Sequence, residues 1–169
     1  TLHSWQTLEC IIKTARFGYD GKGQIKHGIN SNSQESWEKL ATKEAVIERI
    51  IDFDCEASVI VVRDRSGQMA TYPLSLNEHR NHILSKTIAP APLPKDIHDQ
   101  ARQMVCRIAE AVNLVGVLAL ELCVTKEGRL LAKEIAPRTH NSGHWTIDAC
   151  FVSQFENHVR AVCGLPLGS

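Results

Sequence analysis

The sequence has no net charge, because 19 lysines and arginines balance 19 aspartates and glutamates. A neutral chain is not expected to offer a general surface to nucleic acid or to membranes, although a local cationic site for phosphate is compatible with it. Long apolar runs are also missing: none approaches the ~20 residues of a membrane span, and no signal peptide is recognisable. We therefore expect a cytoplasmic protein without nucleic-acid or membrane partners.

The cysteines form no C-x-x-C pair, and most of the six stand inside apolar runs. This pattern favours free, buried thiols in a reducing compartment. Internal repeats and low-complexity tracts are absent as well. The length of 169 residues, 43% of them hydrophobic, suits one ordinary domain or two small units that share a core.

The patterning that is present predicts an α+β fold dominated by antiparallel hairpins. Branched and alternating residues predict strands, and helical spacing of apolar residues predicts helices. The predicted strands cover 8–14, 24–29, 44–51, 56–64, 68–75, 115–125 and 129–138. The predicted helices cover 32–41, 97–112 and 146–164, while 77–84 is predicted to be irregular and 89–94 to be an extended connection.

A glycine-rich stretch, "FGYDGKGQ" (17–24), separates the first two predicted strands. The arrangement predicts a hairpin and differs from the Walker phosphate loop, whose G-x-x-x-x-G-K-[ST] pattern is missing. Backbone N–H groups of such turns can converge on an anion, and Lys13 stands at the end of the entering strand. The loop is interpreted either as a lid over a polyphosphate or as a mobile hairpin tip.

Two glutamates are predicted to face each other across a tight turn. If Glu127 and Gly128 form the centre of that turn, Glu121 lies opposite Glu134 on one face, among the small residues Ala119, Cys123, Ala132 and Ala136. Lys133 then points to the opposite, apolar face. Paired carboxylates in open surroundings suit Mg²⁺, which prefers oxygen ligands, although two solvated glutamates on an exposed face fit the same pattern.

A donor-rich stretch, "EIAPRTHNSGHWT" (134–146), follows directly. Arg138 supplies a planar guanidinium that suits phosphate or carboxylate, Asn141 and Ser142 add neutral donors, and Gly143 lets the backbone approach a ligand. Next to paired acids, this stretch is interpreted as a binding loop rather than as a polar loop before a helix.

At these residues the chain resembles a known family. The strings "KTARFGYDGKGQ", "VIERIIDFDCEASVIVVR", "YPLSLNEHRNHIL" and "EIAPRTHNSGHWTIDACFVSQFENHVRAVCGLPLG" are similar to those of 5-(carboxyamino)imidazole ribonucleotide synthases, the ATP-grasp enzymes of de novo purine biosynthesis. The glycine loop is weakly specific, whereas the "HNSGHWT" and "SQFENH" strings are highly specific. The resemblance implies an ATP-grasp fold, antiparallel sheets with flanking helices.

The implied reaction is the ATP-dependent carboxylation of 5-aminoimidazole ribonucleotide with bicarbonate, through carboxyphosphate, to the N5-carboxy product, ADP and phosphate. Two magnesium ions and a homodimer are implied with it. Alternatives are another ATP-grasp enzyme, such as formate-dependent glycinamide ribonucleotide transformylase or biotin carboxylase, and a nucleotide-binding module without catalysis. The "HNSGH" string argues against the two enzymes. The presence of Lys13, Glu121 and Glu134 argues against the module.

Site residues follow from the resemblance at matching positions. The implied ATP-binding residues are Lys13, Gly18, Tyr19, Asp20, Gly21, Lys22, Gly23, Gln24, Glu48, Arg49, Ile50, Ile51, Glu56, His79, Lys133 and Glu134. Among them, Lys13 is expected at the phosphates, 18–24 as the lid, 48–51 as a hinge that reads adenine, and Glu56 at the ribose hydroxyls. The implied metal ligands are Glu121 and Glu134. The implied substrate residues are Arg138, which is also the catalytic residue, His140, Asn141 and Ser142.

Three positions of the sequence differ from the residues that the family usually has. The family usually has asparagine where this chain has Lys133, arginine at Ala15 and proline at Thr139; we predict that catalysis survives the lysine.

We expect 1–50 to belong to the first ATP-grasp subdomain with the lid, and 51–169 to the second with the metal and substrate loop. The family's N-terminal and C-terminal domains lie outside this sequence. We therefore expect a piece truncated at both ends that turns over poorly alone.

Overall fold

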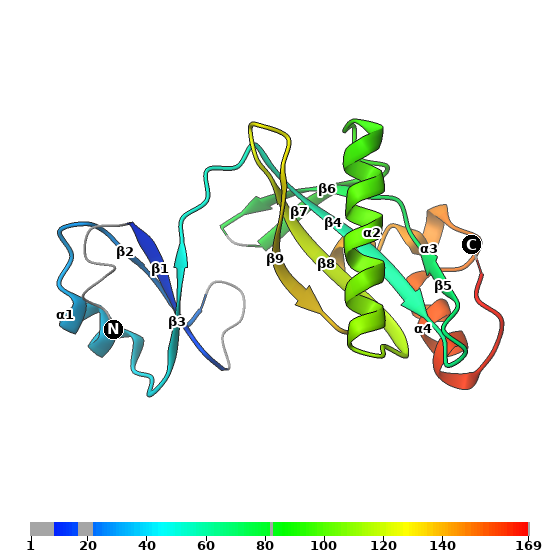
Figure 1. The fold of residues 1–169 in the computed structure, drawn as a ribbon, viewed down its shortest axis with the longest axis horizontal. Helices are drawn as coiled ribbons and strands as arrows, with labels where there is room; N and C mark the ends of the chain where they lie inside the picture. The colour runs from blue at the N-terminus through cyan, green and yellow to red at the C-terminus, as the bar shows by residue number, and fades with distance from the viewer. Residues whose placement is uncertain (1–8, 17–21, 82, 169) are drawn as a thin grey trace. The chain divides into compact units, whose positions relative to one another are not determined.

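The computed structural model describes residues 9–16, 22–81 and 83–168, which fall into two compact units that divide between Asp52 and Phe53. The strands and helices form antiparallel sheets with flanking helices, as the sequence predicts (Figure 1). Each unit has a hydrophobic core of its own. None of the helices in the described part is long and apolar enough to cross a membrane.

The first unit is a small antiparallel sheet with a helix. Its elements are β1 (Cys10–Thr14), β2 (Gln24–His27), α1 (Ser33–Leu40) and β3 (Ala45–Arg49), with strand order β2-β1-β3. The predicted β1–β2 hairpin is therefore confirmed, although both strands are shorter than predicted. Alternation along β1 buries Cys10 and Ile12 against Leu40 of α1, so Lys13 belongs to the other face.

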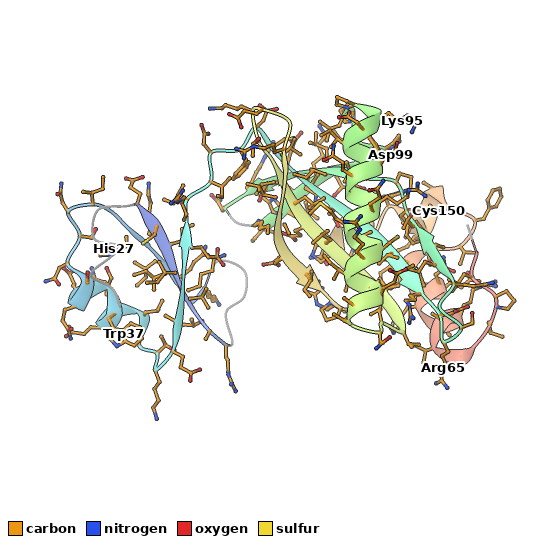
Figure 2. All side chains as sticks on the ribbon, in the orientation of Figure 1. His27, Trp37, Arg65, Lys95, Asp99 and Cys150 are labelled. Atoms are coloured by element: carbon orange, nitrogen blue, oxygen red, sulfur yellow. The ribbon has the colours of Figure 1, made fainter. Side chains whose placement is uncertain are left out.

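His27 and Ser36 tie α1 to this sheet. The His27 ring Nδ1 lies 3.0 Å from the Ser36 hydroxyl, and both residues are buried. Figure 2 labels His27 of β2 and Trp37, which follows Ser36 in α1. The helix begins after Asn32, whose side-chain oxygen accepts a 2.9 Å hydrogen bond from the Gln34 backbone N–H, a typical N-cap.

The second unit is built on one larger antiparallel sheet. Its elements are β4 (Cys55–Arg63), β5 (Met69–Thr71), β6 (Ser75–Arg80), β7 (Ile83–Ile88), α2 (Lys95–Ala111), β8 (Gly116–Val124), β9 (Leu130–Ala136), the 3₁₀ turn η2 (Asn141–Gly143), α3 (Thr146–Ala149) and α4 (Gln154–Cys163). The strand order is β7-β6-β4-β8-β9, and β5 pairs with β4. The central strands β4 and β8 are paired along their whole length.

The two faces of this sheet have different partners. Helix α2 crosses one of them, which we call the back face although it is turned toward the viewer in Figure 1. The helix buries Ile97, Ala101, Val105 and Ala109 at helical spacing against Leu118, Leu120 and Leu122. Lys95 and Asp99 pair one turn apart at the start of α2, 2.5 Å from each other (Figure 2). The other face, the front face, is apolar only at one end, where Ile60, Val62 and Ala119 pack with Ala161 of α4.

Two predictions of secondary structure were wrong. Residues 77–84, predicted to be irregular, belong largely to strands β6 and β7, joined at Asn81 with a φ of 52°. The polar residues there line a polar sheet face, so their polarity does not mark a loop. The predicted helix over 146–164 is broken: Cys150 is extended, and Ser153 starts α4 by accepting a 3.2 Å hydrogen bond from the Glu156 N–H.

The cysteines are free thiols, as predicted, but fewer are buried than predicted. Cys10 and Cys123 are buried, Cys163 is exposed, and the remaining three are partly buried. Figure 2 labels one of these, Cys150, between α3 and α4. The exposed Cys163 lies in the last turn of α4, on the side that faces away from the sheet core.

Candidate functional site

The front face of the second unit carries a cluster of polar side chains where α4 does not cover it. Glu56 and Ser58 come from β4 and Glu121 from β8, and the pairing of these strands sets Ser58 directly beside Glu121. Alternation places all three on the same face as Ile60 and Ala119. The core of the back face and the polar cluster are therefore products of the same strands.

The predicted pairing of Glu121 with Glu134 is confirmed, but the path to it differs. The turn is one residue longer than predicted, since the Thr125 N–H donates to the Arg129 carbonyl and Gly128 takes a φ of 74°. A β-bulge next to Glu121 restores the register, because Leu122 pairs with Ala132 and Glu121 with Glu134. The extra residue in the turn and the extra residue in the bulge compensate each other, so Glu121 still pairs with Glu134.

The bulge reverses the predicted position of Lys133. We expected this side chain on the apolar back face, but its Nζ lies 2.6 Å from Glu56 Oε1 and 3.4 Å from Glu121 Oε2. Lys133 is the residue left without a partner between Ala132 and Glu134, so strict alternation fails there. Ala132, expected beside the acids, instead pairs with Leu122 of the back-face core.

Glu121 is held as a carboxylate by its neighbours. A hydrogen bond from His140, whose Nε2 lies 3.1 Å from Glu121 Oε1, and the charge of Lys133 lower the pKa of Glu121 from 4.5 to about 2, although burial opposes the shift. Burial lowers the pKa of Lys133, but its bonds with Glu56 and the charges of Glu56 and Glu121 raise it by more. Both groups are therefore ionised at neutral pH.

A chain of hydrogen bonds connects Glu121 to the interior of the front face. The Ser142 N–H donates to His140 Nδ1 at 3.4 Å, so the neutral ring carries its proton on Nε2, which faces Glu121. Ser142 Oγ lies 2.9 Å from the same Nδ1 and accepts a 2.8 Å bond from Ser58. Asn77 donates to Ser58 at 2.9 Å. Each hydroxyl thus accepts from one neighbour and donates to the next.

The loop that carries His140 is fixed by α4. The Gln154 side-chain amide accepts from the His140 N–H at 3.0 Å and donates to the His140 carbonyl at 2.7 Å, and Gln154 is fully buried. Gly143 is buried against the sheet, where a Cβ would lie 2.4 Å from Ile60 Cδ1. Its small size therefore serves packing on the sheet, while the expected approach of a ligand at Gly143 stays a prediction.

The other predicted residues of the loop lie at its surface. Arg138 is exposed, and its guanidinium donates to the Thr139 carbonyl at 3.0 Å. Asn141 is exposed at the start of η2, whereas Ser142 is buried. The structure thus brings His140 and Ser142 into the polar cluster and leaves Arg138 and Asn141 open to solvent.

Among the predicted nucleotide residues of the second unit, Glu56 and His79 are in contact. His79 Nδ1 lies 2.7 Å from Glu56 Oε2, and both side chains are mostly buried. Glu56 therefore holds two partners, His79 on one oxygen and Lys133 on the other. Cys123, the β8 partner of Glu56, is buried, and burial raises the pKa of its thiol.

In the first unit, the described residues of the predicted nucleotide site form one ion pair. Lys13 Nζ lies 2.5 Å from Glu48 Oε2, between the adjacent strands β1 and β3. Arg49 ends β3, and Ile50 and Ile51 follow it; Gln24 opens β2. Gly23 has a φ of 73°, and its carbonyl accepts a hydrogen bond from the Thr14 N–H. Lys22 forms a single-residue β-bridge. The predicted lid residues Gly18, Tyr19, Asp20 and Gly21 lie outside the described residues.

The carboxylates fit a divalent cation only as a partial ligand set. Glu121 and Glu134 share one face and offer hard oxygen ligands. No group of three or more His, Cys, Asp or Glu that could hold a metal occurs among the described residues. The donor set fits Mg²⁺ that takes its other ligands from water and phosphate, with Lys133 as a neighbouring positive charge.

Sequence reasoning missed Ser58, Asn77 and Gln154, which position the site. All three are buried polar residues joined by hydrogen bonds to the His140 loop or to each other. Ser58 and Asn77 stand among the apolar and polar positions of two strands, and their pairing cannot be read without the strand order. Gln154 had a signal, since it directly follows the Ser153 N-cap of an S-x-x-E capping pattern.

Known proteins place these features in a family. The ATP-grasp domain family matches residues 4–155, so the chain belongs to the ATP-grasp family. It is 49% identical over 168 residues to the bifunctional purine synthesis protein purC/E of Dictyostelium discoideum, covering 94% of this chain and 17% of that protein. It is 45% identical over 161 residues to the N5-carboxyaminoimidazole ribonucleotide synthase of Bacillus subtilis, covering 95% of this chain and 42% of that enzyme.

Solved structures agree with this assignment. The crystal structure of an ADP complex of N5-carboxyaminoimidazole ribonucleotide synthetase superposes with a TM-score of 0.91 at 38% identity, covering 98% of this chain and 44% of that one. The predicted ATP-grasp fold and the resemblance stated from the sequence are therefore confirmed, since these relatives are named N5-carboxyaminoimidazole ribonucleotide synthase or synthetase. The chain spans less than half the length of these relatives.

Proposed function

We propose that the protein to which this chain belongs carboxylates 5-aminoimidazole ribonucleotide. Bicarbonate attacks the γ-phosphorus of ATP, which gives carboxyphosphate and ADP. The amine of the ribonucleotide then takes the carboxyl carbon, and the carbon–oxygen bond to phosphate breaks. The products are N5-carboxyaminoimidazole ribonucleotide, ADP and phosphate. Such a phosphoryl transfer depends on positioning and charge neutralisation, and it needs no protein nucleophile.

In this proposal, the polar cluster of the front face and its loop handle the reacting groups. Arg138 binds the carboxyphosphate and His140, Asn141 and Ser142 hold the ribonucleotide, while Glu56 and His79 belong to the nucleotide site. Glu121 and Glu134 would hold Mg²⁺, two ions being expected, and bound magnesium supplies positive charge to the phosphates. Lys13 and the glycine loop, as the predicted lid, would bind the nucleotide phosphates, and Glu48 to Ile51 would contact adenine.

The observation that carries the proposal is the meeting of Glu121 with His140. This 3.1 Å contact joins the proposed metal ligand Glu121 to the proposed ribonucleotide loop, in a chain 45% identical to a named synthase. The two side chains of this contact are 11% and 12% exposed, and Gln154 holds both the N–H and the carbonyl of His140, which fixes this part of the loop next to Glu121. This arrangement supports a reaction in which carboxyphosphate and 5-aminoimidazole ribonucleotide must lie next to each other.

ADP formation by the full-length protein tests the proposal. We expect ADP release that needs both bicarbonate and 5-aminoimidazole ribonucleotide, and that stays at background with formate and glycinamide ribonucleotide or with biotin. Arg138→Ala should lower turnover by about 100-fold, as loss of one charge-stabilising group does. ATP binding without any ribonucleotide-dependent hydrolysis would instead support the non-catalytic module. The isolated chain is expected to turn over poorly, and the same assay on it tests that expectation.

The same proposal includes a homodimer that works in the cytoplasm. Free cysteines are compatible with a reducing compartment. Sedimentation of the full-length protein at micromolar concentration should give the mass of two chains. A monomer at that concentration would contradict the proposed dimer but would not test the proposed reaction.

A further inference from the structure

The Lys133 ammonium lies between two largely buried carboxylates that belong to different strands. Its Nζ is 2.6 Å from Glu56 Oε1 on β4 and 3.4 Å from Glu121 Oε2 on β8. The carboxylates are only 18% and 12% exposed, so water screens these contacts weakly. The β-bulge at Lys133 is what brings a β9 side chain into this position.

We propose that Lys133 is a tethered counter-ion that competes with divalent cations for Glu121, so that this protein binds its metal ion more weakly than it would with a neutral residue at position 133. The inference rests on the proposed function in one respect, since Glu121 is taken there as a metal ligand.

The geometry leaves little room for both cations. A divalent ion on Glu121 would lie about 2.1 Å from a carboxylate oxygen, and Lys133 Nζ already lies 3.4 Å from Oε2. Two cations attached to one carboxylate repel each other strongly where water is scarce. The ammonium therefore opposes metal binding at Glu121 for as long as it stays beside that carboxylate.

Glu56 resists the withdrawal of the ammonium from Glu121. Its contact with Lys133 is the shorter of the two, and its other oxygen is fixed by His79 at 2.7 Å. Glu56 therefore holds the Lys133 ammonium in a position next to Glu121. The Lys133 side chain is 35% exposed, which leaves a path to solvent when the ammonium is displaced.

Mn²⁺ binding to the nucleotide-free, full-length protein, followed by the electron paramagnetic resonance of free Mn²⁺, tests the inference. We expect Lys133→Asn and Lys133→Met to bind Mn²⁺ about tenfold more tightly than the wild type, since a neighbouring positive charge is removed from a poorly screened site. Lys133→Arg, which keeps the charge, should stay within about twofold of wild type. Glu121→Gln in the Lys133→Met background should abolish the gain and so place it at this carboxylate.

Lys86→Met is the matched control. Lys86 belongs to the same sheet and pairs with Glu78 at 3.2 Å, but this pair is exposed. Its removal changes the net charge by the same amount and should leave Mn²⁺ affinity unchanged. Thermal unfolding of every variant shows which are folded. Two neutral substitutions of different polarity are used so that the test still holds if only one of them folds.

The outcomes separate this inference from the proposed function. Folded Lys133→Met or Lys133→Asn with wild-type Mn²⁺ affinity would overturn the inference, even if carboxylation is normal. A tenfold gain in a protein that does not carboxylate the ribonucleotide would support the inference and contradict the proposed reaction. Loss of stability alone, without a change in Mn²⁺ affinity, would mean that Lys133 is only a structural ion-pair partner.

Discussion

Glu121 is the side chain where the contacts of the front face converge. His140 donates to one of its oxygens at 3.1 Å, and Lys133 approaches the other at 3.4 Å. Its side chain is 12% exposed, so each partner acts with little screening. An acid in this position is ionised throughout the physiological range, as a ligand for a cation must be.

The depressed pKa of Glu121 predicts a pH dependence of folding stability. A carboxyl with a folded pKa of about 2 and an ordinary value of 4.5 stabilises the fold above pH 4.5, and this contribution is lost as the pH falls toward 2. Glu121→Gln cannot ionise, so its deficit in unfolding free energy should shrink as the pH falls from 5 to 2. Chemical denaturation of both proteins across that range measures the difference.

A deficit that stays constant over this pH range would show that the carboxylate is not stabilised in the folded protein. Glu127→Gln is a suitable control. Glu127 has a lowered pKa as well, first through a hydrogen bond with Thr125, but it is fully exposed in the β8–β9 turn. Its replacement should change the stability little at any pH.

At the scale of elements, the β8–β9 hairpin shows what a sequence can and cannot reveal. Hydrophobic alternation and the Glu127–Gly128 turn signal led to the correct pairing of Glu121 with Glu134, although the predicted turn was one residue too short. They were not enough to predict the face of Lys133, because a longer turn and a β-bulge cancel in the register. A bulge leaves no strong local signal, and here its side chain is held by a contact that is distant in the sequence, Glu56 on β4, on the far side of β8.

Strands β6 and β7 illustrate the second limit. Their polar residues resemble a loop when read alone, but Asn77 and His79 point into a polar face made by β4, and the alternation makes sense only once β4 is beside them. By contrast, helix α2 was predicted almost to its ends, since its apolar spacing and preceding Pro94 are local signals.

The η2 turn gives a prediction at this scale. Gly143→Ala would place a Cβ 2.4 Å from Ile60 Cδ1 and 2.7 Å from the Gln154 side chain, so the turn must move away from the sheet. We expect the KM for the ribonucleotide to rise by about tenfold or more, with a loss of about 1–3 kcal/mol in stability. Steady-state kinetics and thermal unfolding measure the two effects.

Gly28→Ala is the matched control for that substitution. A Cβ at Gly28 would lie 3.4 Å from the Ser31 hydroxyl, an ordinary contact. The KM for the ribonucleotide should therefore stay near the wild-type value. A Gly143→Ala protein with unchanged KM would mean that the position of η2 does not matter for substrate binding.

On the scale of the whole molecule, the chain contains two units with cores of very different size. The core of the first unit centres on Cys10, Ile12 and Leu40, whereas the second unit buries apolar residues on both faces of its sheet. The polar cluster is built entirely from the second unit, and Lys13 with its partner Glu48 belongs to the first. The chain spans less than half of its relatives, so function is best measured on the full-length protein.

The most direct test of the proposed reaction follows oxygen from bicarbonate. When bicarbonate labelled with oxygen-18 attacks ATP, the attacking oxygen becomes part of the carbon–oxygen–phosphorus bridge and stays on phosphorus when that carbon–oxygen bond breaks. The full-length protein, given labelled bicarbonate, ATP and 5-aminoimidazole ribonucleotide, should therefore release inorganic phosphate with one oxygen-18 atom, seen by mass spectrometry. Unlabelled phosphate, formed while ADP accumulates, would show that water attacks ATP instead and would contradict the proposed carboxylation.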